Sequence, residues 1–267
     1  MVYKLSKLGI GDIFLFSLEM RKKNIKDLKI NIDLKTLSIY RSNTPNYINF
    51  VTELIEFLFQ DIPVEFVNNT FNQVYNEDWS VIHNSLNTPE ICEYYKNIFK
   101  KDVGKIEDEY YVLFTKIRDY RYKDYLNIKT EFFNTLNNNN KKILLLGEKE
   151  IEYGVEYKLI GESSIYSIYN DIINNINHDL IVDKTIPKMG ITLPDLNSII
   201  NDMNLIYNSK QTIMIGRGGF FCLSLPTNKL ISLHSEGYSS ILPNINNQGI
   251  FLDSTKFFKI LKNDTNI

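Results

Sequence analysis

Apolar strand-like segments and helix-like segments alternate along this chain, and this rhythm restricts the fold more than any other feature. Residues 142–147 (KILLLG) form a continuous apolar run, which is typical of a strand covered on both faces. Residues 212–216 (TIMIG) repeat the pattern, and strongly apolar helices such as 46–60 lie between the strand segments. A strand–helix–strand alternation predicts an α/β protein with parallel sheets.

The alternation occurs in two series, each of about the size of a domain. The expected strands cover 2–8, 28–34, 62–67, 109–116, 142–147, 157–160, 212–216 and 230–234. The expected helices cover 13–23, 46–60, 90–99, 123–136, 164–176, 196–209, 218–225 and 254–262. We therefore predict two Rossmann-like domains, an N-terminal one over 1–105 and a C-terminal one over 106–253. A final helical segment over 254–267 follows them.

Charge and cysteine usage limit the partners that this chain can have. Among 267 residues the formal net charge is −2, so there is no global basic field for a nucleic acid. Cys92 and Cys222 form no metal or disulfide framework, which fits a reducing compartment. No apolar run approaches the roughly 20 residues that span a bilayer. We expect a cytoplasmic protein without a transmembrane segment. Residues 21–23 (RKK) are compatible with peripheral membrane contact, although a solvated helix end explains them equally well.

Two cationic segments are expected at strand ends of the C-terminal domain. In the GRGG turn, Arg217 can grip two phosphate oxygens, while Gly218 and Gly219 let the backbone approach a ligand at a helix start. In the TKIRDYR segment, Lys116, Arg118 and Arg121 can hold a diphosphate. A glycine turn with a solvated arginine and a solvated charged loop are the structural alternatives.

Three further residues follow predicted strands. Glu148 can accept hydrogen bonds from a ribose, and His234 can touch phosphate or ribose, although a surface carboxylate and a loop histidine explain them as well. Asp12 comes after two glycines, Gly9 and Gly11, in the turn GIGD between a strand and a helix. An acid at a helix start complements the helix dipole, so capping alone explains Asp12. Its functional interpretation is a general base aimed into the cleft between the domains.

These segments together resemble the heptosyltransferase-like glycosyltransferases. The opening strand–GIGD–helix is similar to the start of their acceptor domain, and TIMIGRGGFFCLSLPTNKLISLHSEGY is similar to their nucleotide-sugar segment. The resemblance implies a compact GT-B fold, in which two Rossmann-like domains face each other across a cleft. It places Asp12 as the base, with Gly11 beside it in the same motif. It also places Arg118 or Arg121 in contact with the diphosphate of the donor. The backbone at Gly218 and Gly219 would surround that diphosphate. Arg217 replaces the family's acid, and Cys222 replaces its histidine.

The resemblance implies an inverting, metal-independent transfer of a sugar from a nucleotide-diphosphate donor to an acceptor hydroxyl. The acceptor would be a glycan, a lipid-linked compound or a small molecule. No cofactor is expected beyond the nucleotide sugar, which is a co-substrate, and no metal. Two alternatives stay open. One is a nucleotide-sugar epimerase or fucosyltransferase-like enzyme of the same fold, and the other is a non-catalytic module that binds a nucleotide or a sugar.

Overall fold

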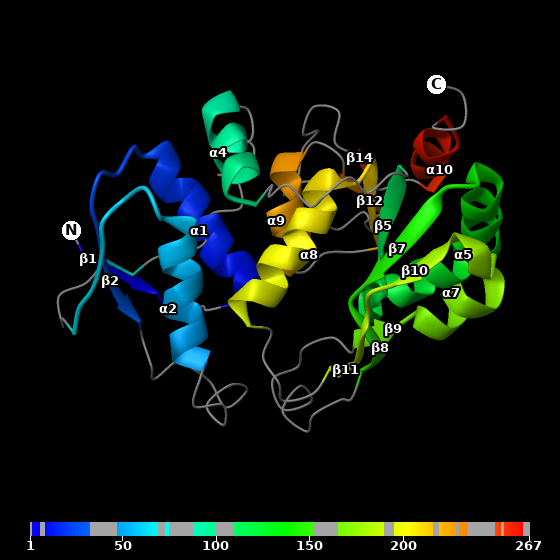
Figure 1. Ribbon diagram of the computed structural model, residues 1–267, viewed down its shortest axis with the longest axis horizontal. Helices are drawn as coiled ribbons and strands as arrows, with labels where there is room; N and C mark the ends of the chain where they lie inside the picture. Colours follow the sequence, from blue (N-terminus) through cyan, green and yellow to red (C-terminus); the bar gives the residue numbers. More distant parts are fainter. Residues whose placement is uncertain are drawn as a thin grey trace.

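Four parallel strands form the sheet of the N-terminal half (Figure 1). In spatial order they are β3 (Val64–Phe66), β2 (Leu28–Ile32), β1 (Val2–Leu5) and β4 (Gln73–Val74). Helix α1 (Ile10–Lys22) connects β1 to β2, and α2 (Tyr47–Leu58) connects β2 to β3. Parallel neighbours need such long crossovers, because each strand must start again from the same edge of the sheet.

Six parallel strands form the sheet of the C-terminal half. Their spatial order is β10 (Ile181–Asp183), β7 (Lys142–Leu146), β5 (Tyr110–Phe114), β12 (Gln211–Ile215), β13 (Leu230–Leu233) and β14 (Gly249–Phe251). The helices of this half are α5 (Asp119–Asn139), α7 (Tyr169–Asn175), α8 (Leu196–Asn208), α9 (Gly219–Ser224) and α10 (Ser254–Asn263), with 3-10 turns η1 (His178–Leu180) and η2 (Leu225–Thr227).

Two small sheets extend the carboxyl ends of the central strands β5 and β7. Directly beyond β5, strand β6 (Lys116–Arg118) pairs antiparallel with β9 (Ile165–Ser167). Beyond β7, strand β8 (Glu148–Ile151) pairs parallel with β11 (Ile186–Met189). Both small sheets therefore lie at the edge of the large sheet where the candidate residues are expected.

This computed structural model describes residues 2–5, 9–32, 47–68, 73–74, 88–99, 109–151, 165–189, 195–215, 219–227, 230–233, 249–251 and 254–263. None of the helices in these ranges is long and apolar enough to cross a membrane.

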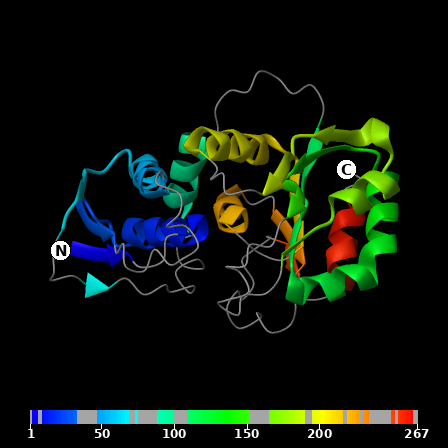
Figure 2. The same ribbon diagram turned by 90° about the horizontal axis from the view of Figure 1, so that it is seen from below.

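The hydrophobic core is divided by the C-terminal sheet. Alternate residues of β7 enter different clusters: Leu144 and Leu146 belong to one, and Ile143 and Leu145 to the other. The first cluster continues through α8, α9 and α4 (Pro89–Phe99) into α1 and α2 of the N-terminal half. The second is covered by α5, α7 and α10. In Figures 1 and 2, α8 and α9 accordingly lie between the two sheets, so one continuous core joins the two halves.

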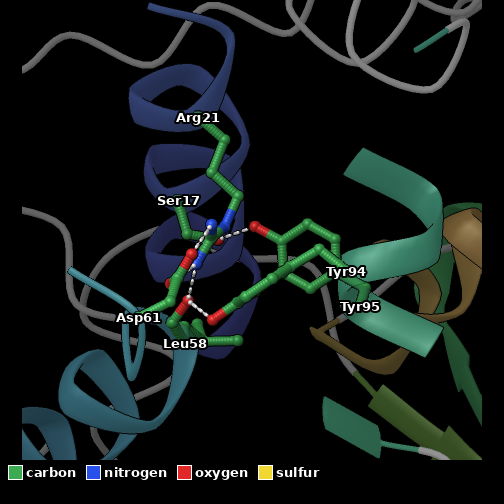
Figure 3. A network of polar contacts seen from close by, with 6 residues as sticks. All are labelled: Ser17, Arg21, Leu58, Asp61, Tyr94 and Tyr95. Atoms are coloured by element: carbon green, nitrogen blue, oxygen red, sulfur yellow. Dashed lines mark hydrogen bonds and ion pairs between the residues drawn. The ribbon is translucent and has the colours of Figure 1, made fainter. Parts of the chain in front are cut away.

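A mostly buried arginine connects three helices of the N-terminal half (Figure 3). Arg21 of α1 donates hydrogen bonds to both carboxylate oxygens of Asp61 at 2.7 and 3.0 Å, and to the Leu58 carbonyl of α2 at 2.7 Å. Its guanidinium carbon lies 3.2 Å from the ring centroid of Tyr94 on α4. The hydrogen bond from Arg21 is the main reason why the pKa of Asp61 is lowered. Planar, bidentate pairing of this kind suits arginine and not lysine.

The burial of Arg21 changes the interpretation of the RKK segment. Its side chain is 8% exposed, whereas Lys22 and Lys23 are exposed at the end of α1. Lys23 is paired with Glu19 one helical turn earlier. Arg21 is therefore a structural residue, and it does not present its charge to a membrane or to an acceptor.

Most of the expected elements are present, but several boundaries differ, and helix α5 runs over Asp119–Asn139 where 123–136 is expected. Helix α1 begins at Ile10 and not at residue 13, because Gly9 is already its N-cap. The helix expected over 164–176 is divided into β9 and α7. There, Ile165–Ser167 pairs with β6, and the Ser167 hydroxyl oxygen accepts a hydrogen bond from the N–H of Tyr169, the first residue of α7, at 3.2 Å. The strand expected over 157–160 lies outside the described residues.

The TKIRDYR segment is not a charged loop, which is the structural alternative to a diphosphate-binding cluster. Lys116–Arg118 forms strand β6, and α5 begins at Asp119. The reason is Ile117, which is 1% exposed and packs in the core on the side of α5. A buried residue between two cations is a strand pattern, so the loop alternative is wrong, while diphosphate binding by this segment stays a prediction.

Candidate functional site

Each of the two parallel sheets has one position where the strand order changes direction. In the N-terminal sheet the chain proceeds from β1 to β2 and β3 on one side, while β4 pairs with β1 on the other. In the C-terminal sheet it proceeds from β5 to β7 and β10 on one side, and from β12 to β13 and β14 on the other. Ligands of open α/β sheets bind beyond the carboxyl ends of the strands at such a position. The candidate site therefore lies beyond β1 in one half and beyond β5 and β12 in the other.

Asp12 lies in the first turn of the helix that follows β1. The Gly9 N–H donates a hydrogen bond to Asp12 Oδ2 at 3.0 Å, so the carboxylate caps the helix, as one of the two interpretations of the sequence predicts. A Cβ atom on Gly9 would lie 2.6 Å from that oxygen, so a side chain at position 9 would displace the capping carboxylate. Gly11 is half-buried within the same turn. The base role of Asp12 remains a prediction beside its observed capping role.

Thr115 fixes the backbone between the central strands β5 and β7. It is fully buried, its N–H donates to the Leu146 carbonyl at 3.0 Å, and its hydroxyl donates to the Glu148 carbonyl at 2.9 Å. Ser167 of β9 donates to the same Glu148 carbonyl at 2.7 Å. Gly147 has φ of +104°, and a Cβ atom there would lie 2.6 Å from the Thr115 hydroxyl oxygen. The chain can therefore make this close turn only with glycine.

The turn at Gly147 brings an acid and a cation together. Lys116 Nζ lies 3.5 Å from Glu148 Oε1, with side chains that are 38% and 14% exposed. Arg118 and Arg121 belong to the adjoining β6 and α5, but their side chains lie outside the described part of the structure. Of the three cations expected here, Lys116 is the one that the structure places beside Glu148.

Asp202 is a further acid of this region that the sequence analysis did not single out. It is the one charged residue in the sequence of α8, the helix that covers this face of the sheet. Its pKa is raised from 3.8 to about 6, first because burial disfavours the charged form and second because Glu148 is negatively charged. Its signal in the sequence is a single acid within an apolar helix, which alone does not reveal the neighbouring carboxylate.

Asp183, at the end of strand β10, is a structural carboxylate and differs from Asp202 in its hydrogen bonds and in the direction of its pKa shift. It accepts hydrogen bonds from the Tyr169 hydroxyl at 2.8 Å and the Thr185 N–H at 2.9 Å, and it pairs with Lys149 at 2.7 Å. Burial opposes the charge of Asp183, but these hydrogen bonds outweigh it and hold its pKa well below the usual range. Its hydrogen-bonding capacity is largely used within the protein.

The other predicted site residues belong to the loops after β12 and β13. Gly219 is the first residue of α9, a helix that packs against α1 of the other half. Arg217, Gly218 and His234 lie outside the described residues. Cys222 is 2% exposed and packs in the core that the two halves share.

Comparison with protein-family models, with curated proteins and with solved structures found no match.

Proposed function

We propose that this protein is a glycosyltransferase that moves a sugar from a nucleoside-diphosphate donor to an acceptor hydroxyl, with inversion and without a metal ion. In this proposal the two halves are the Rossmann-like domains of a compact GT-B enzyme. The donor lies on the C-terminal half, and a glycan, lipid-linked or small-molecule acceptor lies on the N-terminal half. The observation that carries the proposal is that Asp12 follows β1 and Lys116 follows β5, the strands at which the two sheets change direction.

The chemistry of sugar transfer needs two kinds of group at this place. A base removes the proton of the attacking hydroxyl, and positive charge stabilises the departing diphosphate. Asp12 supplies the carboxylate on the N-terminal side, and α1, which carries it, packs against α9 at the end of β12. Lys116 supplies a cation at the end of β5, where its contact with Glu148, at 3.5 Å, is longer than a good charged hydrogen bond. In this proposal the ammonium group faces a phosphate of the donor.

A thermal-shift screen with ADP, GDP, UDP and CDP tests donor binding. A nucleotide at 100 times its dissociation constant adds about 2.7 kcal/mol to the stability of the protein that binds it. We expect one nucleotide to raise the melting temperature clearly. If all four leave it unchanged, the donor-binding half of the proposal is wrong.

Substitution of Asp12 tests the reaction. Asp12→Asn should leave nucleotide affinity unchanged and abolish the release of nucleoside diphosphate from a nucleotide sugar. An asparagine oxygen can still accept the hydrogen bond from Gly9, so a loss of activity would not come from loss of the cap. Turnover close to that of the wild type would exclude Asp12 as the base.

A non-catalytic module that binds a nucleotide or a sugar is the second candidate. Two observations favour it: the Asp12 carboxylate already has a structural use, and Cys222 is packed in the core where the resemblance expects a histidine. Nucleotide binding without turnover of any nucleotide sugar would support this candidate. An epimerase of the same fold would instead change the sugar with donor alone, which product analysis without an acceptor detects.

A further inference from the structure

Helix α4 packs against helices of both halves of the protein (Figures 1 and 2). On one side it contacts α1, and on the other it contacts α8 and η2, which belong to the C-terminal half. Its buried side chains are Ile91, Tyr95 and Phe99. Protein interiors are close-packed, so α4 can keep all of these contacts only while the two halves hold one relative position.

Polar contacts fix α4 on the N-terminal half (Figure 3). The Tyr94 hydroxyl donates a hydrogen bond to the Leu58 carbonyl of α2 at 3.0 Å, and the guanidinium of Arg21 lies over the Tyr94 ring. The hydroxyl groups of Tyr95 and Ser17 lie 2.6 Å apart, and both residues are fully buried. Hydrogen bonds are directional, unlike apolar contacts, so they hold α4 at one place on α1 and α2.

Phe99, the last residue of α4, joins the two halves through a row of aromatic rings. Its ring centroid lies 5.4 Å from that of Phe57 on α2 and 5.6 Å from that of Tyr207 on α8. Helix α8 is in turn attached to its sheet, because the Tyr110 hydroxyl of β5 donates to the Leu205 carbonyl at 2.7 Å. The contacts therefore run without a break from α2 through α4 and α8 to β5.

The interface that α4 borders continues beside the candidate site. Helix α1, which carries Asp12 in its first turn, packs against α9, the helix that follows β12. Buried residues of both helices, such as Phe14 and Cys222, belong to one hydrophobic cluster. Domains move relative to each other by default, but a large apolar interface between them prevents this movement.

We propose that α4 holds the two halves in one fixed relative position, so that the candidate site keeps the same shape with and without a ligand. The fixed position follows from packing alone. Its consequence for the site rests on the proposed function: Asp12 and Lys116 keep one spacing, and donor binding does not close the halves about a hinge. The apparent affinity for the donor is then not reduced by a population of open molecules.

Hydrogen exchange followed by mass spectrometry in increasing urea tests the fixed position, because peptides report on each half of the full-length protein separately. Ile30→Ala in β2 and Ile143→Ala in β7 are a matched pair, since both isoleucines are fully buried and each half contains one. We expect either variant to lower the urea midpoint of both halves equally, by about 1 M. If each variant lowers only the midpoint of its own half, the halves are independent and the proposal is wrong. Ile30→Val and Ile143→Val give the same readout with smaller shifts if an alanine variant does not fold.

Phe99→Ala tests whether α4 is the helix responsible. The substitution interrupts the row of rings between α2 and α8, so we expect the midpoints of the two halves to separate by about 0.5 M or more. Phe132→Ala is the matched control, at an equally buried phenylalanine of α5, and should lower both midpoints without separating them. Midpoints that still coincide in Phe99→Ala would overturn the assignment to α4. Phe99→Leu takes its place if Phe99→Ala does not fold.

Small-angle X-ray scattering tests the consequence for the site. The wild type is measured alone and with a saturating concentration of ADP, GDP, UDP or CDP, whichever gives the largest thermal shift. We expect the radius of gyration to stay the same, and a decrease on binding would show that the halves close. If none of the four nucleotides binds, the proposed function is wrong, whereas the urea midpoints still decide whether α4 fixes the halves.

Discussion

Asp202 is ionised at neutral pH in a position that burial and Glu148 make unfavourable, so its replacement by asparagine should stabilise the protein. The pKa of Asp202 rises to about 6 in the folded state, against about 3.9 in an unfolded chain. Because the folded pKa is the higher one, the folded state binds more protons between these values, and stability falls as the pH rises from about 4 to 6. Two pKa units correspond to about 3 kcal/mol. Partial access of the carboxyl group to water reduces this energy. We therefore expect Asp202→Asn to raise the free energy of unfolding by about 1–3 kcal/mol at neutral pH.

Urea unfolding at pH 4.5 and at pH 8 measures this effect. Asp202→Asn should be clearly more stable than the wild type at pH 8, and about two thirds of this difference should be lost at pH 4.5. Asp179→Asn, at an exposed acid of η1, is the matched control and should change little at either pH. Equal stability of Asp202→Asn and wild type at pH 8, or a gain independent of pH, would refute the reasoning.

Three other substitutions test how the two halves are built. Arg21→Lys should lower the free energy of unfolding by about 1–3 kcal/mol, because an ammonium group cannot both pair with the two oxygens of Asp61 and stack on the ring of Tyr94. The control Lys22→Arg, at the exposed neighbouring position, should not change the urea midpoint. Gly147→Ala should lower the melting temperature through a cost of about 1–3 kcal/mol, because it forces a side chain into a positive φ and against a threonine hydroxyl; an unchanged melting curve would contradict the turn geometry. Asp12→Ala should destabilise the protein by about 1 kcal/mol relative to Asp12→Asn, which keeps an acceptor for the Gly9 N–H; equal stability of the two variants would show that this cap contributes nothing.

The parts of the fold that could be predicted from the sequence are those with a long and clear hydrophobic pattern. The apolar runs of β7 and β12 and the helix α2 carry such a pattern over at least five residues, and all three are present. The edge strands β10 and β14 have three residues each, which is too short for a period of two to be recognised. Their position is decided by pairing with β7 and β13, which is a tertiary effect.

The candidate site shows the same division between local and tertiary information. Asp12, Lys116 and Glu148 could be found because each lies at the end of a predicted strand or shortly after one, and strand ends of parallel sheets are where ligands bind. Asp202 could not be found in this way, since its raised pKa comes first from burial in the folded protein and second from Glu148, which lies 54 positions earlier in the sequence. The turn at Gly147 is similar, because the need for glycine comes from Thr115 on the adjacent strand.

Hydrogen exchange followed by mass spectrometry, with and without the nucleotide that gives the largest thermal shift, tests the central claim most directly. The claim is that a nucleotide donor binds beyond the carboxyl ends of β5 and β12, where the order of the C-terminal sheet reverses. We predict slower exchange in peptides that cover 114–119 and 215–222, and no change in peptides of β10, the edge strand of this sheet that lies three strands from β12. Slower exchange confined to the N-terminal sheet, or no change in any peptide at saturating nucleotide, would contradict the account.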